Sequence, residues 1–248
     1  SSSADHGTMS MNIIEEFTPL FAPKTVAVIG ASTKGNALPN VFIRRIREFG
    51  FSGDIYPIHP GAAEIDGLTA YKTLADTPKP VDYAYIAVSG AQIPGMLAAA
   101  KGHVRFAQVI SSGFGEVDEG KGLQDELVSA ARAGGMRLLG PNCLGIYTPR
   151  GGVTFAEIGP KEVGHVGIVS QSGGLGTDII RRGLSRGVKF SGLVTVGNCA
   201  DVTPSDLLEF YLADPQTEVI GMYIETAKDG SRLFDILRNA KASIAGGR

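Results

Sequence analysis

Short apolar runs alternate with amphipathic segments along most of the chain. In the first half, five such runs have the length and β-branched content of buried strands, and helical spacing recurs between them. The predicted strands are Thr25–Ile29, Asp54–Ile58, Tyr83–Val88, Phe106–Ile110 and Met136–Leu139. A short amphipathic segment, Ile13–Phe21, precedes them, and the predicted helices are Val41–Phe49 (ending at Gly50), Ile93–Lys101 and Leu123–Ala133. Strands alternating with helices predict a parallel, doubly wound α/β sheet.

Three more strand–helix units follow a connection that contains Gly and Pro, Arg150–Gly164. The predicted strands are Val166–Val169, Phe190–Val196 and Glu218–Ile224; the helices are Leu175–Ser185, Thr203–Tyr211 and one that begins near Asp229. We therefore predict two α/β domains, residues 11–150 and residues 151–248.

Clusters of Gly, Pro, Ser or Asn follow four of the five strands in the first half. They lie at Gly30–Gly35, His59–Gly61, Ser111–Gly115 and Gly140–Gly145. Ligands of doubly wound sheets bind beyond the carboxyl ends of the strands. Turn chemistry alone explains each cluster, but their shared placement favours a ligand cleft.

The first cluster favours a nucleotide-like ligand, although it matches neither common nucleotide motif. Gly30–Gly35 lacks the G-x-G-x-x-G spacing, and His59-Pro60 stands where a dinucleotide fold has a ribose-binding acid. Asn36-Ala37 follows Gly35, where a Walker A loop has Lys and then Ser or Thr.

The stretch Val166–Gly176, V-G-I-V-S-Q-S-G-G-L-G, predicts a strand, a small polar turn and a helix. The first amides of a helix have no partner within it and attract anions, so this turn is suited to a phosphate or a carboxylate. The alternative is a tight connection with Ser172 as N-cap. The spacing leaves both interpretations open.

Composition excludes several classes of partner. Lys plus Arg is 23 and Asp plus Glu is 25, a net charge of −2, which gives no electrostatic case for nucleic acid or an anionic membrane surface. We find no signal peptide and no apolar run near the length of about 20 residues that spans a bilayer.

Cys143 and Cys199 have no metal-ligand spacing around them, so we predict free thiols, no metal site and a cytoplasmic location. Residues 1–8 resemble a tag remnant before Met9 or Met11 and are set aside.

Four ordered motifs carry a family resemblance: V-A-V-I-G-A-S, L-L-G-P-N-C-L-G, I-V-S-Q-S-G-G-L-G and G-N-x-A-D-V-x-x-x-D-L-L-E-F. From about Leu20 onward the chain resembles the NDP-forming (ADP-forming) acyl-CoA synthetases of the succinyl-CoA synthetase superfamily. The resemblance implies a Rossmann-like CoA-binding domain, then a flavodoxin-like domain of the succinyl-CoA synthetase type that could be incomplete at its C-terminus. Both sheets are expected to be parallel.

The resemblance also implies roles for individual residues. CoA phosphates would bind at Gly30, Ala31, Ser32 and Gly35, and the adenine end would bind at His59 and Pro60. Pantetheine would lie along Val88, Ser89, Ser111, Ser112 and Gly113, and the thiol end would lie near Asn142 and Cys143. A histidyl phosphate would be held by Ser170, Gln171, Ser172, Gly173 and Gly174, and the catalytic acid Glu225 would orient that histidine.

The chain departs from the family pattern at several positions. The family usually has Asn-Pro at His59-Pro60, a Pro in place of Ser89 and a Lys in place of Cys199. Its phosphorylated histidine lies further along, in a Ser-His-Thr-Gly-type loop that this chain lacks. The histidines here are His6, His59, His103 and His165. His165 is at the far end of its strand, about 15–20 Å from the anion turn at about 3.3 Å per residue, and His103 is expected to be solvated.

The resemblance implies a function together with its partners. The chain would be the CoA-binding portion of an enzyme that converts acid, CoA and ATP to acyl-CoA, ADP and phosphate through a phosphohistidine, and would be inactive alone. ATP and Mg²⁺ would bind a nucleotide-grasp domain or subunit, a small carboxylic acid would be the substrate, and a homo-oligomer is left open. The alternative is a non-catalytic CoA-sensing module of an acetyltransferase-type fusion. An NAD-dependent oxidoreductase would need the absent ribose-binding acid.

Overall fold

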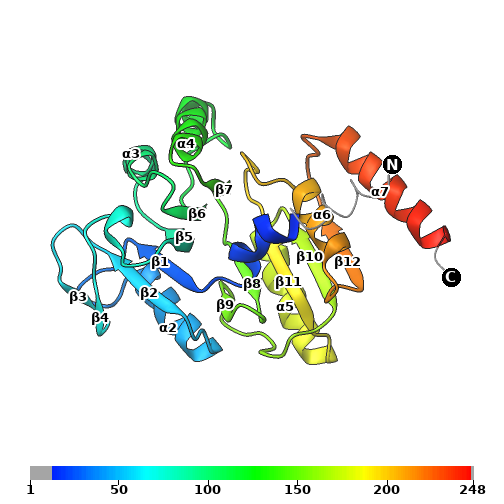
Figure 1. Ribbon diagram of the computed structural model, residues 1–248, viewed down its shortest axis with the longest axis horizontal. Coiled ribbons are helices and arrows are strands. Elements are labelled where there is room, and N and C mark those ends of the chain that lie inside the picture. Colours follow the sequence, from blue (N-terminus) through cyan, green and yellow to red (C-terminus); the bar gives the residue numbers. More distant parts are fainter. Residues whose placement is uncertain (1–12, 247–248) are drawn as a thin grey trace.

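In the computed structural model, the chain is described over residues 13–246, with side chains through residue 240. Residues 1–8, Met9 and Met11 lie outside the described part. Two five-stranded sheets stand side by side, the first half of the chain on the left of Figure 1 and the second half on the right. Residues 13–21 form a helix that lies between them.

The first sheet is wholly parallel, as the sequence predicts, with the order β2-β1-β5-β6-β7. Its strands are β1 (Thr25–Ile29), β2 (Asp54–Ile58), β5 (Val81–Ile86), β6 (Val104–Val109) and β7 (Arg137–Leu139). The helices of this half are α2 (Leu38–Phe49), α3 (Ile93–Ala98) and α4 (Lys121–Ala133). A small hairpin of β3 (Glu64–Ile65) and β4 (Leu68–Thr69), which the sequence analysis does not predict, follows β2.

The sequence determines the end and the buried face of α2. Phe42, Ile43 and Ile46 recur at helical spacing and are buried, and Phe42 stacks on Tyr85 with ring centroids 4.1 Å apart. Gly50 ends the helix in the left-handed conformation, with φ 104°, and its amide donates to the last turn. The predicted stop at Gly50 is confirmed.

The second sheet is mixed, with the order β12-β10-β11-β8-β9. The strands β10 (Val166–Ser170), β11 (Phe190–Thr195) and β12 (Val219–Tyr223) are parallel, whereas β8 (Ile146–Thr148) and β9 (Val153–Thr154) are antiparallel. The expectation of a wholly parallel second sheet is therefore wrong at this edge. Strands of two or three residues are too short to show a periodicity. The helices here are α5 (Gly173–Arg186), α6 (Pro204–Ala213) and α7 (Gly230–Gly246).

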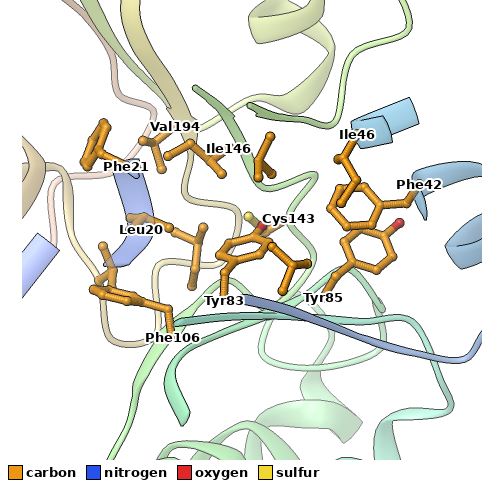
Figure 2. Close-up of a cluster of buried hydrophobic side chains, with 14 of the residues drawn as sticks. Leu20, Phe21, Phe42, Ile46, Tyr83, Tyr85, Phe106, Cys143, Ile146 and Val194 are labelled. Carbon is orange, nitrogen blue, oxygen red and sulfur yellow. The ribbon is translucent and has the colours of Figure 1, made fainter. Parts of the chain in front are cut away.

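One apolar cluster joins the two halves of the chain (Figure 2). It combines Tyr83 and Phe106 of the first sheet with Ile146 and Val194 of the second, and Leu20 and Phe21 enter it from the helix at residues 13–21. Because the halves share this buried core, the ends of their strands are held in a fixed relation. The predicted division at residue 150 stays a prediction, and β8, which precedes it, pairs with β11 of the second sheet.

Ion pairs reinforce the same junction. Arg137 of β7 donates from Nε to Asp201 and from Nη2 to Asp206, each at 3.0 Å. Both aspartates belong to the second half, on the turn after β11 and on α6. The turn after β11 is therefore tied to the edge strand of the first sheet.

Candidate functional site

A pocket of about 690 Å³ opens between the two halves, at the carboxyl ends of β6, β7, β10, β11 and β12. Parallel strands bring their carboxyl ends to one edge, so turns distant in sequence meet there. The pocket is lined by Ile110, Gly115, Glu116, Gln124, Asn142, Cys143, Leu144, Gln171, Ser172, Gly173, Gly174, Thr195, Gly197, Asn198, Glu225, Thr226 and Lys228.

The turn between β10 and α5 forms one wall of this pocket. Ser172 is the N-cap of α5, and its Oγ accepts a hydrogen bond from the Leu175 amide at 3.2 Å. The predicted cap is confirmed, and binding of an anion at this turn stays a prediction. Ser170 is fully buried, and its hydroxyl donates to the Ser172 carbonyl at 2.7 Å. Ser170 thus stabilises the turn from behind, whereas the amides of Gly173 and Gly174 begin the helix at the pocket.

The two glycines of the turn have different surroundings. A Cβ at Gly173 would lie 2.7 Å from Cδ1 of Leu144, so this glycine allows the turn to pack against the end of the first half. A Cβ at Gly174 would lie no closer than 4.0 Å to another atom, the Oγ of Ser172. Gly174 therefore leaves space open beside the first amides of α5.

Glu225 follows β12 and is exposed at the mouth of the pocket. Its backbone amide donates to Oε1 of Gln171 at 2.7 Å, and Lys228 Nζ donates to the Asn198 carbonyl at 2.7 Å. The Glu225 carboxylate makes no hydrogen bond and no ion pair with any residue in the range 13–240. It is available to a group that enters the pocket.

Glu116 and Asn198 are pocket residues that the sequence analysis misses. The Glu116 carboxylate accepts hydrogen bonds from the amides of Gly113 and Phe114 and from the Asn198 side chain. Burial disfavours the ionised carboxylate, but these donors outweigh burial and hold the pKa of Glu116 below its ordinary value. The available signals are that Glu116 follows the Gly-containing cluster after β6 and that Asn198 is the Asn of the motif G-N-x-A-D-V after β11.

Cys143 lies at the pocket but is part of the buried core (Figure 2). It is 3 % exposed, and its Sγ donates to the Thr195 carbonyl at 3.0 Å. Burial raises the pKa of the Cys143 thiol to about 12, and that of the Cys199 thiol to about 11. The neighbouring Asn142 has φ 54° and its amide donates to the Ser111 carbonyl at 2.9 Å, which ties the turns after β7 and β6 together.

The other residues expected to bind CoA follow β1, β2, β5 and β6 and lie outside the lining of this pocket: Gly30, Ala31, Ser32, Gly35, His59, Pro60, Val88, Ser89, Ser111, Ser112 and Gly113. They share the carboxyl edge of the first sheet. A Cβ at Gly30 would lie 2.4 Å from the Ala87 carbonyl oxygen, which explains the glycine. Ser111 Oγ donates to the Val88 carbonyl at 2.6 Å, so the turns after β5 and β6 are also joined.

His59 performs a local structural task at the end of β2. Its Nδ1 accepts hydrogen bonds from the amides of Gly61 at 3.1 Å and Ala62 at 2.8 Å. An Asn side chain accepts similar bonds in turns, and Asn is the residue that the resemblance leads us to expect here. Because Nδ1 accepts, the ring proton of the neutral imidazole is on Nε2.

The described histidines, His59, His103 and His165, all lie outside the pocket lining. His165 lies at the amino end of β10, where its Nδ1 contacts the Gln216 carbonyl at 2.9 Å. His103 is half-buried and contacts the Thr77 hydroxyl at 2.8 Å, so the expectation of a solvated side chain is wrong.

The described residues give no sign of a metal site or of a membrane span. They contain no group of three or more His, Cys, Asp or Glu side chains that could hold a metal ion. None of their helices has the length and apolar character required to cross a membrane.

Comparisons with known proteins agree with these features. A CoA binding domain model matches residues 24–149, and a model of the succinyl-CoA ligase like flavodoxin domain matches residues 163–245. The chain is 40% identical over 229 residues to the acetate–CoA ligase (ADP-forming) I subunit alpha of Pyrococcus furiosus, covering 88% of this chain and 49% of that protein. It is 33% identical over 228 residues to the 4-hydroxybutyrate–CoA ligase (ADP-forming) of Nitrosopumilus maritimus, covering 90% and 32%.

A solved structure has the same architecture. The dinucleotide-forming acetyl-coenzyme A synthetase 1 of Candidatus Korarchaeum cryptofilum, in complex with phosphate and ADP, superposes with a TM-score of 0.81 and 38% identity, over 90% of this chain and 49% of that one. The chain thus spans about half the length of the first relatives it matches, or less. It belongs to the ADP-forming acyl-CoA synthetase family, as an alpha-subunit-like chain with a CoA-binding domain followed by a succinyl-CoA ligase-like flavodoxin domain.

Proposed function

We propose that the chain is the CoA-binding and ligase-domain portion of an enzyme that converts a small carboxylic acid, CoA and ATP to acyl-CoA, ADP and phosphate through a phosphohistidine. The observation that carries the proposal is the convergence of Asn142, the Ser172–Gly174 helix start and Glu225 on one pocket. Preorganised amides at a helix start stabilise phosphoryl charge without having to reorganise. The pocket thus joins the end of the CoA-binding domain to a phosphate cradle.

CoA would bind along the carboxyl edge of the first sheet, and it supplies the thiol that takes the acyl group. Gly30, Ala31, Ser32 and Gly35 would hold its phosphates, near the exposed Lys34 and near Arg44, which donates to the Gly35 carbonyl. Lys34 complements an anionic ligand, and Arg44 also faces the Asp66 carboxylate at 3.7 Å. His59 and Pro60 would border the adenine, Val88, Ser89, Ser111, Ser112 and Gly113 would flank pantetheine, and Asn142 and Cys143 would border the thiol end.

Ser172, Gly173 and Gly174 would hold the histidyl phosphate, and Glu225 would accept a hydrogen bond from that histidine and fix its orientation. The phosphorylated histidine would come from sequence outside this chain. ATP and Mg²⁺ would bind a nucleotide-grasp domain or a separate subunit, which the alpha-subunit relative supports. The chain alone would therefore form no thioester. We also propose a cytoplasmic location.

Calorimetry and an activity assay on the 248-residue chain test this proposal together. We expect CoA to bind, inorganic phosphate to bind separately, and no acyl-CoA or phosphohistidine to form with ATP, Mg²⁺ and acetate. CoA binding without phosphate binding would contradict the ligase assignment and favour the non-catalytic CoA-sensing module. Thioester formation by the chain alone would overturn the placement of the nucleophile outside it.

A further inference from the structure

Gln171 makes three hydrogen bonds to the segment that carries Glu225. Its side-chain Oε1 accepts hydrogen bonds from the backbone amides of Glu225 at 2.7 Å and Thr226 at 3.0 Å. The backbone amide of Gln171 donates to the Tyr223 carbonyl at 2.9 Å. Both partners of the side-chain atom are N–H donors, so that atom is the carbonyl oxygen. The Gln171 side-chain oxygen is thus hydrogen-bonded to the backbone that follows β12.

The segment after β12 has few other attachments. Glu225, Thr226 and Lys228 are all exposed. The second attachment is Lys228, whose Nζ donates to the carbonyls of Asn198 at 2.7 Å and Cys199 at 3.4 Å. Gln171 therefore determines where the chain leaves β12, and Glu225 is the residue at that point.

We propose that Gln171 is a positioning residue for Glu225 and not a ligand of the phosphate, which is the role that the family resemblance implies for it. The inference rests on the proposed function, because that function gives Glu225 its task of orienting a histidine. A carboxylate that orients another group must be held to a fraction of an ångström. An exposed residue after an edge strand lacks that precision unless its backbone is fixed. The Gln171 carbonyl fixes two successive amides, and it does so from the phosphate turn itself.

Two substitutions separate the positioning role from a contact with phosphate. Gln171→Met keeps the side-chain length and removes both the acceptor and the donor. Gln171→Glu keeps acceptor oxygens and removes the side-chain N–H donors. Gln216→Met is the matched control, because Gln216 donates to the Gly164 carbonyl at the opposite end of the same sheet. Amide hydrogen exchange at Glu225 and Thr226, followed by NMR in the full chain, reports on the backbone. Titration with inorganic phosphate reports on the cradle.

We expect Gln171→Met to accelerate exchange of the two amides at least about fivefold, because each loses its acceptor. Gln171→Glu should restore the protection, and Gln216→Met should leave it unchanged. Phosphate affinity in Gln171→Met should stay within about threefold of the wild type, since no phosphate contact is lost. Unchanged exchange in Gln171→Met, failure of Gln171→Glu to restore it, or a larger loss of phosphate affinity in Gln171→Met would each overturn the positioning role. Failure of the proposed function would be seen separately, as a wild-type chain that does not bind CoA or does not bind phosphate, whereas the exchange of the two amides reports on the positioning by Gln171 in either case.

Discussion

Asn198 donates its side-chain amide to the Glu116 carboxylate, and the two residues come from different halves of the chain. The same Asn198 amide donates to Gln124 Oε1 at 3.1 Å, and the Asn198 carbonyl accepts from Lys228. Asn198 therefore connects the turn after β11 with the loop after β6, with α4 and with the segment after β12. The shape of the pocket depends on this connection.

The substitution Asn198→Asp should destabilise the chain in a pH-dependent way. It replaces a donor to the ionised Glu116 by a second carboxylate, so one carboxyl of the pair acquires a raised pKa. We expect a loss of about 1–3 kcal/mol at pH 7.5 and a smaller loss near pH 5, where the pair shares a proton. Urea unfolding at both pH values measures this, with Asn36→Asp at an exposed position as control. An equal loss at both pH values would contradict the coupling.

Substitutions of Gly173 and Gly174, at the start of α5, should separate stability from the proposed phosphate binding. Gly173→Val places a Cβ against Leu144, so we expect a loss of about 1–3 kcal/mol in the free energy of unfolding. Gly174→Val has room for its Cβ but brings its methyl groups beside the first amides of α5. It should change stability by less than about 1 kcal/mol and weaken phosphate binding at least about tenfold. Thermal unfolding measures the stability of both variants, and phosphate titration measures their affinity for phosphate. A larger loss of stability in Gly174→Val together with a larger loss of phosphate affinity in Gly173→Val would contradict the roles given to the two glycines.

Cys143 should not form a mixed disulfide with oxidised CoA, although it borders the pocket. The thiolate is the reactive species, and a pKa of about 12 leaves almost none of it at neutral pH. Mass spectrometry after incubation with oxidised CoA should therefore find no mass gain in the folded chain. The urea-unfolded chain should be modified, which controls for reagent activity. Modification of folded wild type that is lost in Cys143→Ser would contradict the buried geometry.

Asp206 should contribute to acid lability. Burial alone would raise its pKa, but the Thr203 amide, Arg232 and Arg137 outweigh burial and hold the pKa of Asp206 below its ordinary value. The stabilisation is therefore complete above about pH 4 and is lost as the pH falls through the lower, folded-state pKa. Asp206→Asn should cost about 2 kcal/mol at pH 7 and reduce the decline in stability below pH 4. Parallel stability–pH curves for the two proteins would contradict this.

The sequence predicts elements well where local signals agree. β1 and β2 occur at the predicted residues, and Gly50 and Ser172 act as caps of α2 and α5. Their signals are short-range, either a run of β-branched residues or a cap beside a periodic segment. The strands β8 and β9 are missed because they are only two or three residues long, and β8, which pairs with β9, joins the sheet through β11 far along the chain.

The candidate site is likewise predictable only where a local sequence motif marks its residues. The Gly-rich turns are recognisable as motifs, and the family resemblance points to Glu225. Asn142 and the start of α5 follow strands of different sheets and meet because the two halves share one apolar core. Glu116 and Asn198 are 82 residues apart in sequence, and no local pattern pairs them. Gln171 is found by its motif, but the bonds from its side chain to the amides of Glu225 and Thr226 become visible only when β10 and β12 are placed side by side.

Titration of the intact 248-residue chain with CoA and with NADH, by calorimetry under the same conditions, tests the central claim most directly. The whole chain is required, because the apolar core is shared between its halves. We predict that CoA binds at least about tenfold more tightly than NADH, a difference of about 1.4 kcal/mol, because His59 follows β2 where NADH binding would need an acid. Equal or tighter binding of NADH, or no binding of CoA, would contradict the assignment of the first half as a CoA site.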